Sequence, residues 1–199
     1  MLKNKLSKWV LSFLFLSTQS LSFAETTAKP ITKDEILQAQ KEWADEIVKI
    51  GQLHESKGDY KAEAKKTLEH LYGYSEGAVL FKPTKASVDQ FRETQEQAFS
   101  YFVTGTEAED HGFSLKPWTK VRFDEKEQIF IDSDSAIAMG NYYFTDKTGK
   151  ETKVEFSFGY KRAKDSHLVI FLHHSSLPYV PESTQQDHKN NKHDSEEHD

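Results

Sequence analysis

The sequence predicts an α+β fold, with helices in the first half of the chain and an antiparallel sheet in the second. Helical apolar periodicity extends from about Thr32 to Thr104, and short strand-like segments separated by turn residues follow from Pro117. Such a sheet needs helices across one face to bury its apolar side chains. We therefore expect one domain over residues 32–180. In it, N-terminal helices pack on a strongly curved antiparallel sheet, and the resulting cone encloses a small-molecule pocket.

The composition is compatible with this fold. A chain of 199 residues fits one domain with tails. Only 36% of the residues are hydrophobic, but 13% are aromatic, so a core built from Phe, Tyr and Trp is feasible. The chain has no cysteine, which excludes disulfides, thiolate metal ligands and a cysteine nucleophile.

The first 24 residues have the pattern of a secretory signal peptide. Three lysines precede an apolar segment from Trp9 to Leu16, and Ser22-Phe23-Ala24 forms a small-x-small cleavage site. The apolar segment is too short to span a membrane. We expect cleavage after Ala24, a secreted or periplasmic location, and a polar leader over residues 25–31.

Cleavage would leave an acidic chain. Without Lys3, Lys5 and Lys8, the 26 basic residues become 23 against 32 acidic ones, a formal charge of −9. Nucleic acid binding depends on neutralising phosphates with Lys and Arg, so nucleic acid is a poor candidate partner. The segment 181–199 is polar and without apolar periodicity, and we expect a disordered tail. Its histidines lack the spacing of a specific metal site, which leaves weak opportunistic binding as the favoured interpretation.

Capping signals place the helices. Thr32 and Glu35 have the spacing of a capping box, and the helix that they begin is expected to end near Ser56. Asp59 is placed to cap a second helix. Residues 78–81 can be a strand or an extended connector, and a third helix is expected from about residue 87 until Gly105.

Five strand-like segments then predict an antiparallel meander. They read W-T-K-V-R-F, Q-I-F-I-D, S-A-I-A-M-G-N-Y-Y-F-T-D, T-K-V-E-F-S-F-G-Y-K-R and L-V-I-F-L-H-H-S-S. The last two carry apolar residues for both faces of the sheet. We expect a partner subunit to cover the second face, in a homodimer or larger oligomer.

The final segment carries the candidate chemistry. The apolar run Leu168–Leu172 is typical of a buried strand, and His173, His174, Ser175 and Ser176 follow it directly. A strand end rich in His and Ser is also common where a strand simply emerges into solvent, so composition alone leaves both interpretations open. Residues two apart share a face, which pairs His173 with Ser175 and His174 with Ser176.

The final strand, the hairpin G-N-Y-Y-F-T-D-K-T-G-K and the segment S-F-G-Y-K-R together resemble the iota class of carbonic anhydrases. These are relatives of the association domain of calcium/calmodulin-dependent protein kinase II, within the SnoaL-like, cystatin-like cone-fold group. The motif H-H-S-S-x-P, here from His173 to Pro178, is the most specific part of a resemblance that covers roughly Ile36 to Tyr179. It implies reversible hydration of carbon dioxide to bicarbonate inside the cone, in some members without a metal.

The resemblance also implies site residues. A Thr near the start of the long helix and a Tyr on that helix match Thr84 and Tyr101, and one His/Ser pair of the motif completes the catalytic set. Without the resemblance, a hydroxyl such as Thr84 would be interpreted as a helix cap.

The choice of pair follows the kinase relative, whose ligand-facing arginine aligns with His174. On that alignment His174 and Ser176 are catalytic, and Asn141 and Tyr143 line the pocket from the neighbouring strand. The other pair, His173 and Ser175, is kept as a candidate for substrate contacts.

A metal normally lowers the pKa of bound water to near 7. Without one, His174 is the best available base or proton shuttle, because the pKa of imidazole ordinarily lies near neutral pH. We expect no cofactor. The alternative is a divalent metal such as zinc or manganese, but the motif guarantees only one inward histidine.

Two other functions are alternatives on the same fold. The first is a noncatalytic oligomerisation module that holds a small anion in the same pocket. The second is proton transfer of the ketosteroid isomerase type, which needs a carboxylate base in an apolar cavity. No acidic residue lies among the apolar positions of the late strands in a way that would serve it.

Overall fold

The computed structural model describes residues 29–181. The predicted signal peptide, the first residues of the leader and almost all of the predicted tail lie outside this range, so those assignments stay predictions. No helix in residues 29–181 is long and apolar enough to cross a membrane. The elements are α1 (Lys33–Glu55), α2 (Tyr60–Leu71), β1 (Leu80–Lys82), α3 (Gln95–Val103), β2 (Lys120–Phe123), β3 (Gln128–Ile131), β4 (Ser135–Thr145), β5 (Glu151–Arg162) and β6 (Leu168–Ser176), with short 3-10 turns at Gly73–Ser75 and Phe113–Leu115.

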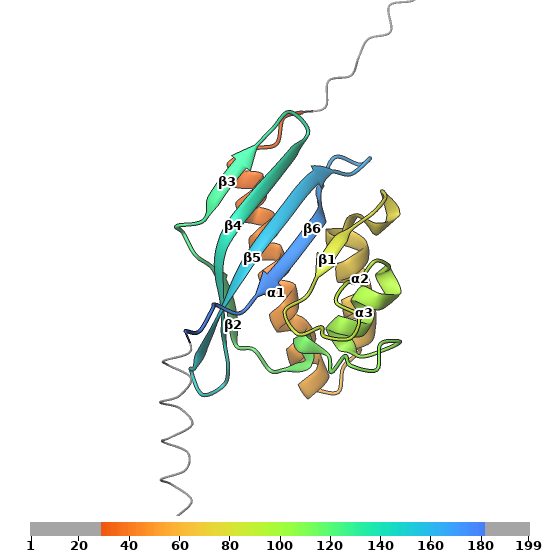
Figure 1. Ribbon diagram of the computed structural model, residues 1–199. Coiled ribbons are helices and arrows are strands. Elements are labelled where there is room, and N and C mark those ends of the chain that lie inside the picture. The colour runs from red at the N-terminus through yellow and green to blue at the C-terminus, as the bar shows by residue number, and fades with distance from the viewer. Residues whose placement is uncertain (1–28, 182–199) are drawn as a thin grey trace, which may run out of the picture.

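The strands form one open sheet with α1 lying across its inner face (Figure 1). The strand order is β1-β6-β5-β4-β2, and β3 pairs with β4 beyond the end of β2. The antiparallel arrangement predicted for β4, β5 and β6 is confirmed. One strand differs, since β1 comes from the helical half of the chain and pairs in parallel with β6. The predicted α+β class with helices on one face is confirmed.

The helix starts follow the capping signals. Thr32 and Glu35 form the predicted capping box, in which the Thr32 hydroxyl accepts the Glu35 N–H at 3.3 Å and the Glu35 carboxylate accepts the Thr32 N–H at 2.9 Å. The Asp59 carboxylate accepts the Ala62 N–H at 3.0 Å and so caps α2. The first two predicted helices are therefore confirmed.

The third helix is shorter than predicted, because it begins at Gln95 and not near Ser87. The Glu109 carboxylate accepts the backbone N–H groups of Ser87, Val88 and Asp89, at 2.7 to 3.1 Å to its nearest oxygens. These amides are held by a side chain from another loop instead of by helical carbonyls. The segment between β1 and α3 is consequently a loop fastened to residues 109–110.

An aromatic core joins α1 to the sheet, as the composition indicated. The buried Trp43 ring of α1 lies 5.7 Å from Tyr142, 5.6 Å from Phe158 and 5.6 Å from His173, measured between ring centroids. This contact defines the inner face of the sheet. The buried residues of that face on β4 and β5 are Ala136, Ala138, Tyr142, Phe144, Val154, Phe156, Phe158 and Tyr160.

A β-bulge in β6 sets which of its side chains point inward. Gly159 pairs with Leu172 while Tyr160 pairs with Ile170, so Phe171 is an extra residue in the ladder. Ile170 and His173 therefore both oppose inner-face residues of β5 although they are three positions apart. The Phe171 ring occupies the space above Gly159, where an added Cβ would lie only 2.7 Å from it.

Candidate active site

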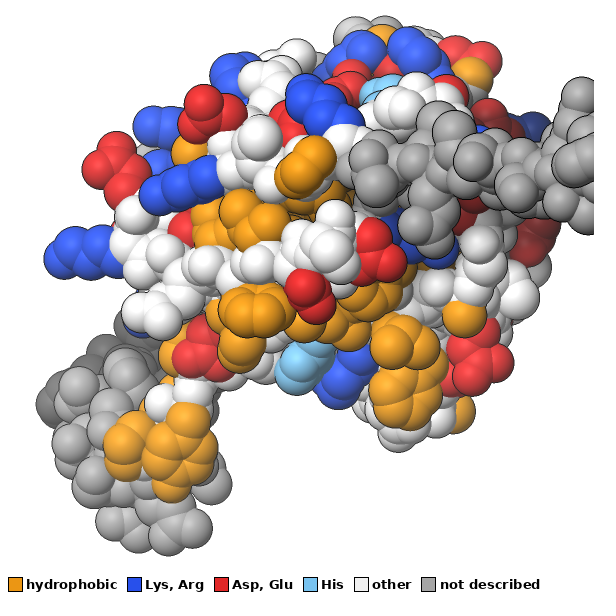
Figure 2. All heavy atoms as spheres, turned by 90° about the horizontal axis from the view of Figure 1, so that it is seen from above, with side chains coloured by type: hydrophobic (Ala, Val, Ile, Leu, Met, Phe, Trp, Pro, Cys, Tyr) orange, Lys and Arg blue, Asp and Glu red, His pale blue; other side chains and the backbone are white. Residues whose placement is uncertain are grey.

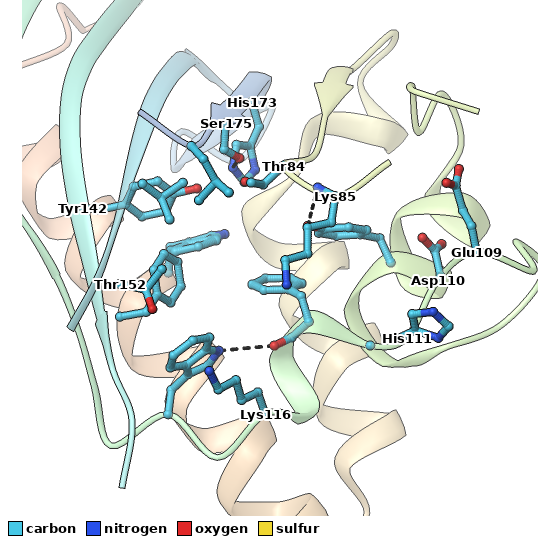
Figure 3. A pocket seen from close by; sticks show the side chains of 18 residues that line it. Thr84, Lys85, Glu109, Asp110, His111, Lys116, Tyr142, Thr152, His173 and Ser175 are labelled. Carbon is cyan, nitrogen blue, oxygen red and sulfur yellow. Dashed lines mark hydrogen bonds between the residues drawn. The ribbon is translucent and has the colours of Figure 1, made fainter. Parts of the chain in front are cut away.

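A cavity of about 330 Å³ lies between the inner face of the sheet, α3 and the loop that follows α3 (Figure 3). Because one water occupies about 30 Å³ of liquid volume, the cavity has room for carbon dioxide and several waters. Exposed side chains such as Lys85, His111 and Lys116 contribute to its lining, so the cavity reaches the surface. Its buried polar lining consists of Tyr101, Asp110, Tyr142, His173 and Ser175, with the half-buried Thr84 beside them.

The pair of the motif that faces the cavity is His173 with Ser175. These residues oppose Phe158 and Phe156 of the inner face and are 2% and 4% exposed. His174 is exposed on the other face of the sheet, and the Ser176 hydroxyl donates to Glu155 at 3.1 Å on that same face. The prediction that His174 and Ser176 face the cavity is wrong, because the bulge at Phe171 shifts the alternation of β6 by one residue.

Asn141 and Tyr143 were also predicted to line the cavity, and this is wrong because β4, which pairs with β5 without a bulge, turns these two residues to the outer face of the sheet. Asn141 pairs with Glu155 and Tyr143 with Lys153, all on the face of the sheet turned away from α1. The Tyr143 ring lies there under the Arg122 guanidinium, 4.0 Å from ring centroid to Cζ. The residue of β4 that reaches the cavity is Tyr142.

Thr84 and Tyr101 line the cavity as predicted, from the loop after β1 and from α3. Thr84 stands in a turn well before the start of α3, so it does not cap that helix. The Tyr101 hydroxyl accepts the Lys85 N–H at 3.4 Å. Burial raises the pKa of Tyr101 to about 12, so this phenol stays protonated at neutral pH and can donate into the cavity.

A hydrogen-bonded chain runs from α1 to the cavity through residues that the sequence analysis did not select. The Trp43 Nε1–H donates to the Tyr72 hydroxyl at 3.0 Å, and the Tyr72 oxygen lies 2.7 Å from His173 Nδ1. On the other side of the imidazole, Nε2 lies 3.2 Å from Ser175 Oγ. In the sequence Trp43 and Tyr72 look like apolar-face residues of helices, and only their polar atoms, buried far from solvent, indicate this second role.

The wall of the cavity around His173 is uncharged at neutral pH. Burial lowers the pKa of His173 well below its ordinary value of 6.5, and the neighbouring His174 lowers it further. Burial likewise raises the pKa of the Tyr142 phenol, while the neighbouring Ser175 side chain opposes that rise. The inner wall is therefore made of a neutral imidazole and hydroxyl groups, which can donate hydrogen bonds to an oxygen that becomes negative.

The charged groups lie toward the rim. The Arg92 guanidinium and the Asp110 carboxylate form a buried two-pronged ion pair, at 2.6 and 3.2 Å. Glu109 holds the loop between β1 and α3. Hydrogen bonds from the Ser87 and Val88 amides of that loop lower the pKa of the Glu109 carboxyl to about 2. These contacts fasten the loop that carries Thr84 to the segment that follows α3. Among residues 29–181, no group of three or more His, Asp or Glu side chains is arranged to hold a metal ion.

The fold and the site define a class of protein: a cone-fold domain with a small cavity, lined by hydroxyl groups, at the His/Ser end of its last long strand. Comparison with known families makes this assignment specific. The family described as metal-independent carbonic anhydrase matches residues 34–177, and the chain belongs to this family. The family description agrees with the expectation that no metal cofactor is used.

Individual relatives support the assignment. A metal-independent carbonic anhydrase of Nostoc sp. strain PCC 7120 is 43% identical over 156 residues, which are 76% of this chain and 76% of the relative. The crystal structure of a cyanobacterial iota-carbonic anhydrase complexed with bicarbonate is 42% identical, with a TM-score of 0.73 over 76% of this chain and 95% of that chain. A protein from Xanthomonas campestris described as a calcium/calmodulin-dependent protein kinase II association domain is 25% identical, with a TM-score of 0.51 over 73% and 88% of the two chains. The resemblance drawn from the motif is confirmed.

Proposed function

We propose that this protein catalyses the reversible hydration of carbon dioxide to bicarbonate, without a metal, in the cavity described above. The observation that carries the proposal is the convergence of Thr84, Tyr101, His173 and Ser175 on one small cavity in a chain of this family. The relative crystallised with bicarbonate supports the choice of ligand.

The reaction needs a water oxygen to attack the carbon while one carbon–oxygen π pair moves onto an oxygen. Hydroxyl donors from Thr84, Tyr101 and Ser175 stabilise the negative charge that grows on that oxygen. The proton lost by the attacking water passes to another water in the cavity and through the open rim to solution. A neutral inner wall suits uncharged carbon dioxide, and the rim lysines Lys85 and Lys116 attract the bicarbonate product outward.

The direct test is stopped-flow hydration of carbon dioxide by the purified protein, with and without exhaustive chelation. The proposal expects activity that chelation leaves unchanged. Activity that chelation abolishes and one divalent metal restores would contradict the metal-free mechanism. If the protein binds bicarbonate but hydrates no carbon dioxide under either condition, the noncatalytic anion-binding module is the correct function.

We also propose that the protein is a homodimer through the outer face of the sheet. Phe130, Ile137 and Met139 share this face and are 67%, 39% and 56% exposed, an unusual concentration of apolar side chains for a surface. Figure 2 looks from above, at right angles to the view of Figure 1, and shows hydrophobic side chains gathered in several patches among charged ones on that side of the molecule. An interface over this face would bury them and leave the cavity, on the inner face, unobstructed.

Light scattering coupled to gel filtration tests the dimer. The expected mass is twice that of the chain, and Met139→Asp is expected to shift it to the monomer. Leu37→Asp is the matched control, because Leu37 is an apolar residue 41% exposed on α1, away from the outer face. A monomeric wild type, or equal dissociation by both variants, would contradict the proposed interface.

We further propose that the protein is exported and acts outside the cytoplasm, as the lysine-rich start and the Ser22-Phe23-Ala24 site indicate. Cell fractionation followed by N-terminal sequencing tests this. A periplasmic or secreted chain that begins at Glu25 is expected. A cytoplasmic chain that retains residues 1–24 would contradict export.

A further inference from the structure

The cavity-facing imidazole of His173 is held at both nitrogens by protein groups. Nδ1 lies 2.7 Å from the Tyr72 oxygen, and Nε2 lies 3.2 Å from Ser175 Oγ. His173 is 2% exposed, and its ring is stacked on Phe81 with 4.6 Å between ring centroids and lies edge-to-face with Phe158 with 4.2 Å between centroids. The side chain therefore has one orientation, and only the position of its proton is left to determine.

The Trp43 indole determines that position. An indole N–H can only donate, so the Tyr72 oxygen must accept the hydrogen bond from Trp43 at 3.0 Å. The hydrogen of the Tyr72 hydroxyl then needs an acceptor of its own. Tyr72 is 1% exposed, and in the described part of the chain His173 Nδ1 is the one acceptor within hydrogen-bonding distance of this hydroxyl.

The reverse arrangement is disfavoured. If Nδ1 carried the proton, the Tyr72 oxygen would accept two hydrogen bonds, and its own hydrogen would point without a partner into rings such as Phe81 and Phe102. A buried hydroxyl donor without an acceptor costs the desolvation of that group. The nearby Tyr74 offers no relief, because its hydroxyl donates to the Arg92 carbonyl at 2.8 Å and, in the described part of the chain, makes no hydrogen bond with the Tyr72 hydroxyl.

We propose that Trp43 and Tyr72 are positioning residues that hold His173 in the tautomer protonated at Nε2, so that the imidazole donates to Ser175 and leaves the Ser175 hydrogen free to donate onward. The chain of donors runs Trp43 to Tyr72 to His173 to Ser175 and ends at the cavity. In its use for catalysis the inference rests on the proposed hydration of carbon dioxide.

The tautomer changes the role of the histidine. With Nδ1 occupied by the Tyr72 hydroxyl and Nε2 already protonated, His173 has no free lone pair with which to take a proton from water. Its role is to polarise Ser175, since a hydroxyl that accepts a hydrogen bond becomes a better donor itself. The site then works by donating hydrogen bonds to the oxygens of carbon dioxide and bicarbonate, and the water proton leaves through solvent.

Nitrogen-15 NMR of the labelled full chain reads the tautomer without turnover. His173→Gln identifies the signals of this ring by their loss. The inference expects a pyrrole-type shift for Nε2 and a pyridine-type shift for Nδ1 in the wild type, and a mixture of the two tautomers in Tyr72→Phe. A wild-type ring protonated at Nδ1 would overturn the proposal, whatever the activity of the protein.

The kinetic arm uses a matched pair of hydroxyl deletions. Tyr72→Phe is expected to lower kcat for hydration by about tenfold with KM changed by less than about twofold, the pattern of an interaction that matters mainly in the transition state. Tyr74→Phe removes a neighbouring tyrosine hydroxyl that bonds to the Arg92 carbonyl, and it is expected to leave both constants within about twofold. Equal losses in the two variants would show a merely structural role and overturn the catalytic part of the inference.

The two arms separate this inference from the proposed function. If the wild type shows the Nε2 tautomer but hydrates no carbon dioxide, the proposed function fails and the hydrogen-bond direction stands. If Tyr72→Phe does not fold, Trp43→Phe replaces it, since without the indole N–H the Tyr72 hydrogen can turn to the side that Trp43 occupied while the Tyr72 oxygen accepts from Nδ1. In that variant the proton of His173 is expected to move in part to Nδ1. Nitrogen-15 shifts identical to those of the wild type would contradict the role given to Trp43.

Discussion

Replacing His173 by Gln should remove much of the acid sensitivity of the protein between pH 7 and pH 5. The imidazole is buried and neutral, and burial holds its pKa well below the ordinary value of 6.5. Below pH 6.5 the unfolded chain therefore binds a proton that the folded chain does not, so stability falls as the pH falls. The loss continues downward until the pH reaches the pKa of the folded state.

The size of the loss in unfolding free energy follows from how far the pH lies below the ordinary pKa of histidine. One pH unit below it corresponds to about 1.4 kcal/mol, so this single group should cost about 0.7 kcal/mol at pH 6 and about 2 kcal/mol at pH 5, relative to pH 7. The depressed carboxyls Glu35 and Glu109, with pKa values of about 2, lose their stabilising effect only below the ordinary value of 4.5 and hardly contribute in this window.

Urea unfolding at pH 7, 6 and 5 measures the effect as the difference between wild type and His173→Gln. His174→Gln is the matched control, because His174 is the adjacent imidazole on the exposed face and burial lowers its pKa to a lesser degree. We expect the gap between wild type and His173→Gln to shrink by about 2 kcal/mol from pH 7 to pH 5. If the free energy of unfolding of wild type and of His173→Gln depended on pH in the same way, the imidazole of His173 would not be buried and neutral.

Three further predictions concern the frame around the site. Asp110→Ala leaves the Arg92 guanidinium buried without its carboxylate, and chemical denaturation should show a loss of about 3–5 kcal/mol; a loss below about 1 kcal/mol would contradict a buried ion pair. Gly159→Ala places a methyl group 2.7 Å from the Phe171 ring, and we expect a loss of about 1–3 kcal/mol in the same assay, whereas an unchanged stability would show that the bulge has room to adjust. Thr84→Val removes a hydroxyl from the cavity at nearly constant volume, and kcat/KM for hydration should fall by about tenfold or more while the melting temperature stays nearly the same; full activity would remove Thr84 from the site.

Local signals in the sequence were sufficient for much of the fold. The capping box at Thr32 and the cap at Asp59 each involve residues within four positions of one another, so the sequence alone reveals them. Both begin helices where expected. The late strands follow from alternation and turn chemistry. The third helix was placed too early because the carboxylate that binds the expected first amides belongs to Glu109, 20 to 22 residues later in the chain.

The site was predicted in outline but with the wrong face of the last strand. The continuous apolar run before His173 gives no alternation from which to count, and an alignment to a distant relative decided the choice. The extra residue at Phe171 could be inferred only from the pairing of β6 with β5, which is a long-range property. The role of Tyr72 was hidden for a similar reason, since its partners Trp43 and His173 are 29 and 101 positions away.

The central claim is that His173 and Ser175, and not their neighbours, form the catalytic wall of the cavity. Initial rates of carbon dioxide hydration for Ser175→Ala and Ser176→Ala, measured side by side by stopped flow in a chelated buffer, test it most directly. The account predicts a loss of about 100-fold for Ser175→Ala, the usual effect of removing one donor to a developing oxyanion, and a change within about twofold for Ser176→Ala. The opposite pattern, with activity lost in Ser176→Ala and kept in Ser175→Ala, would contradict it.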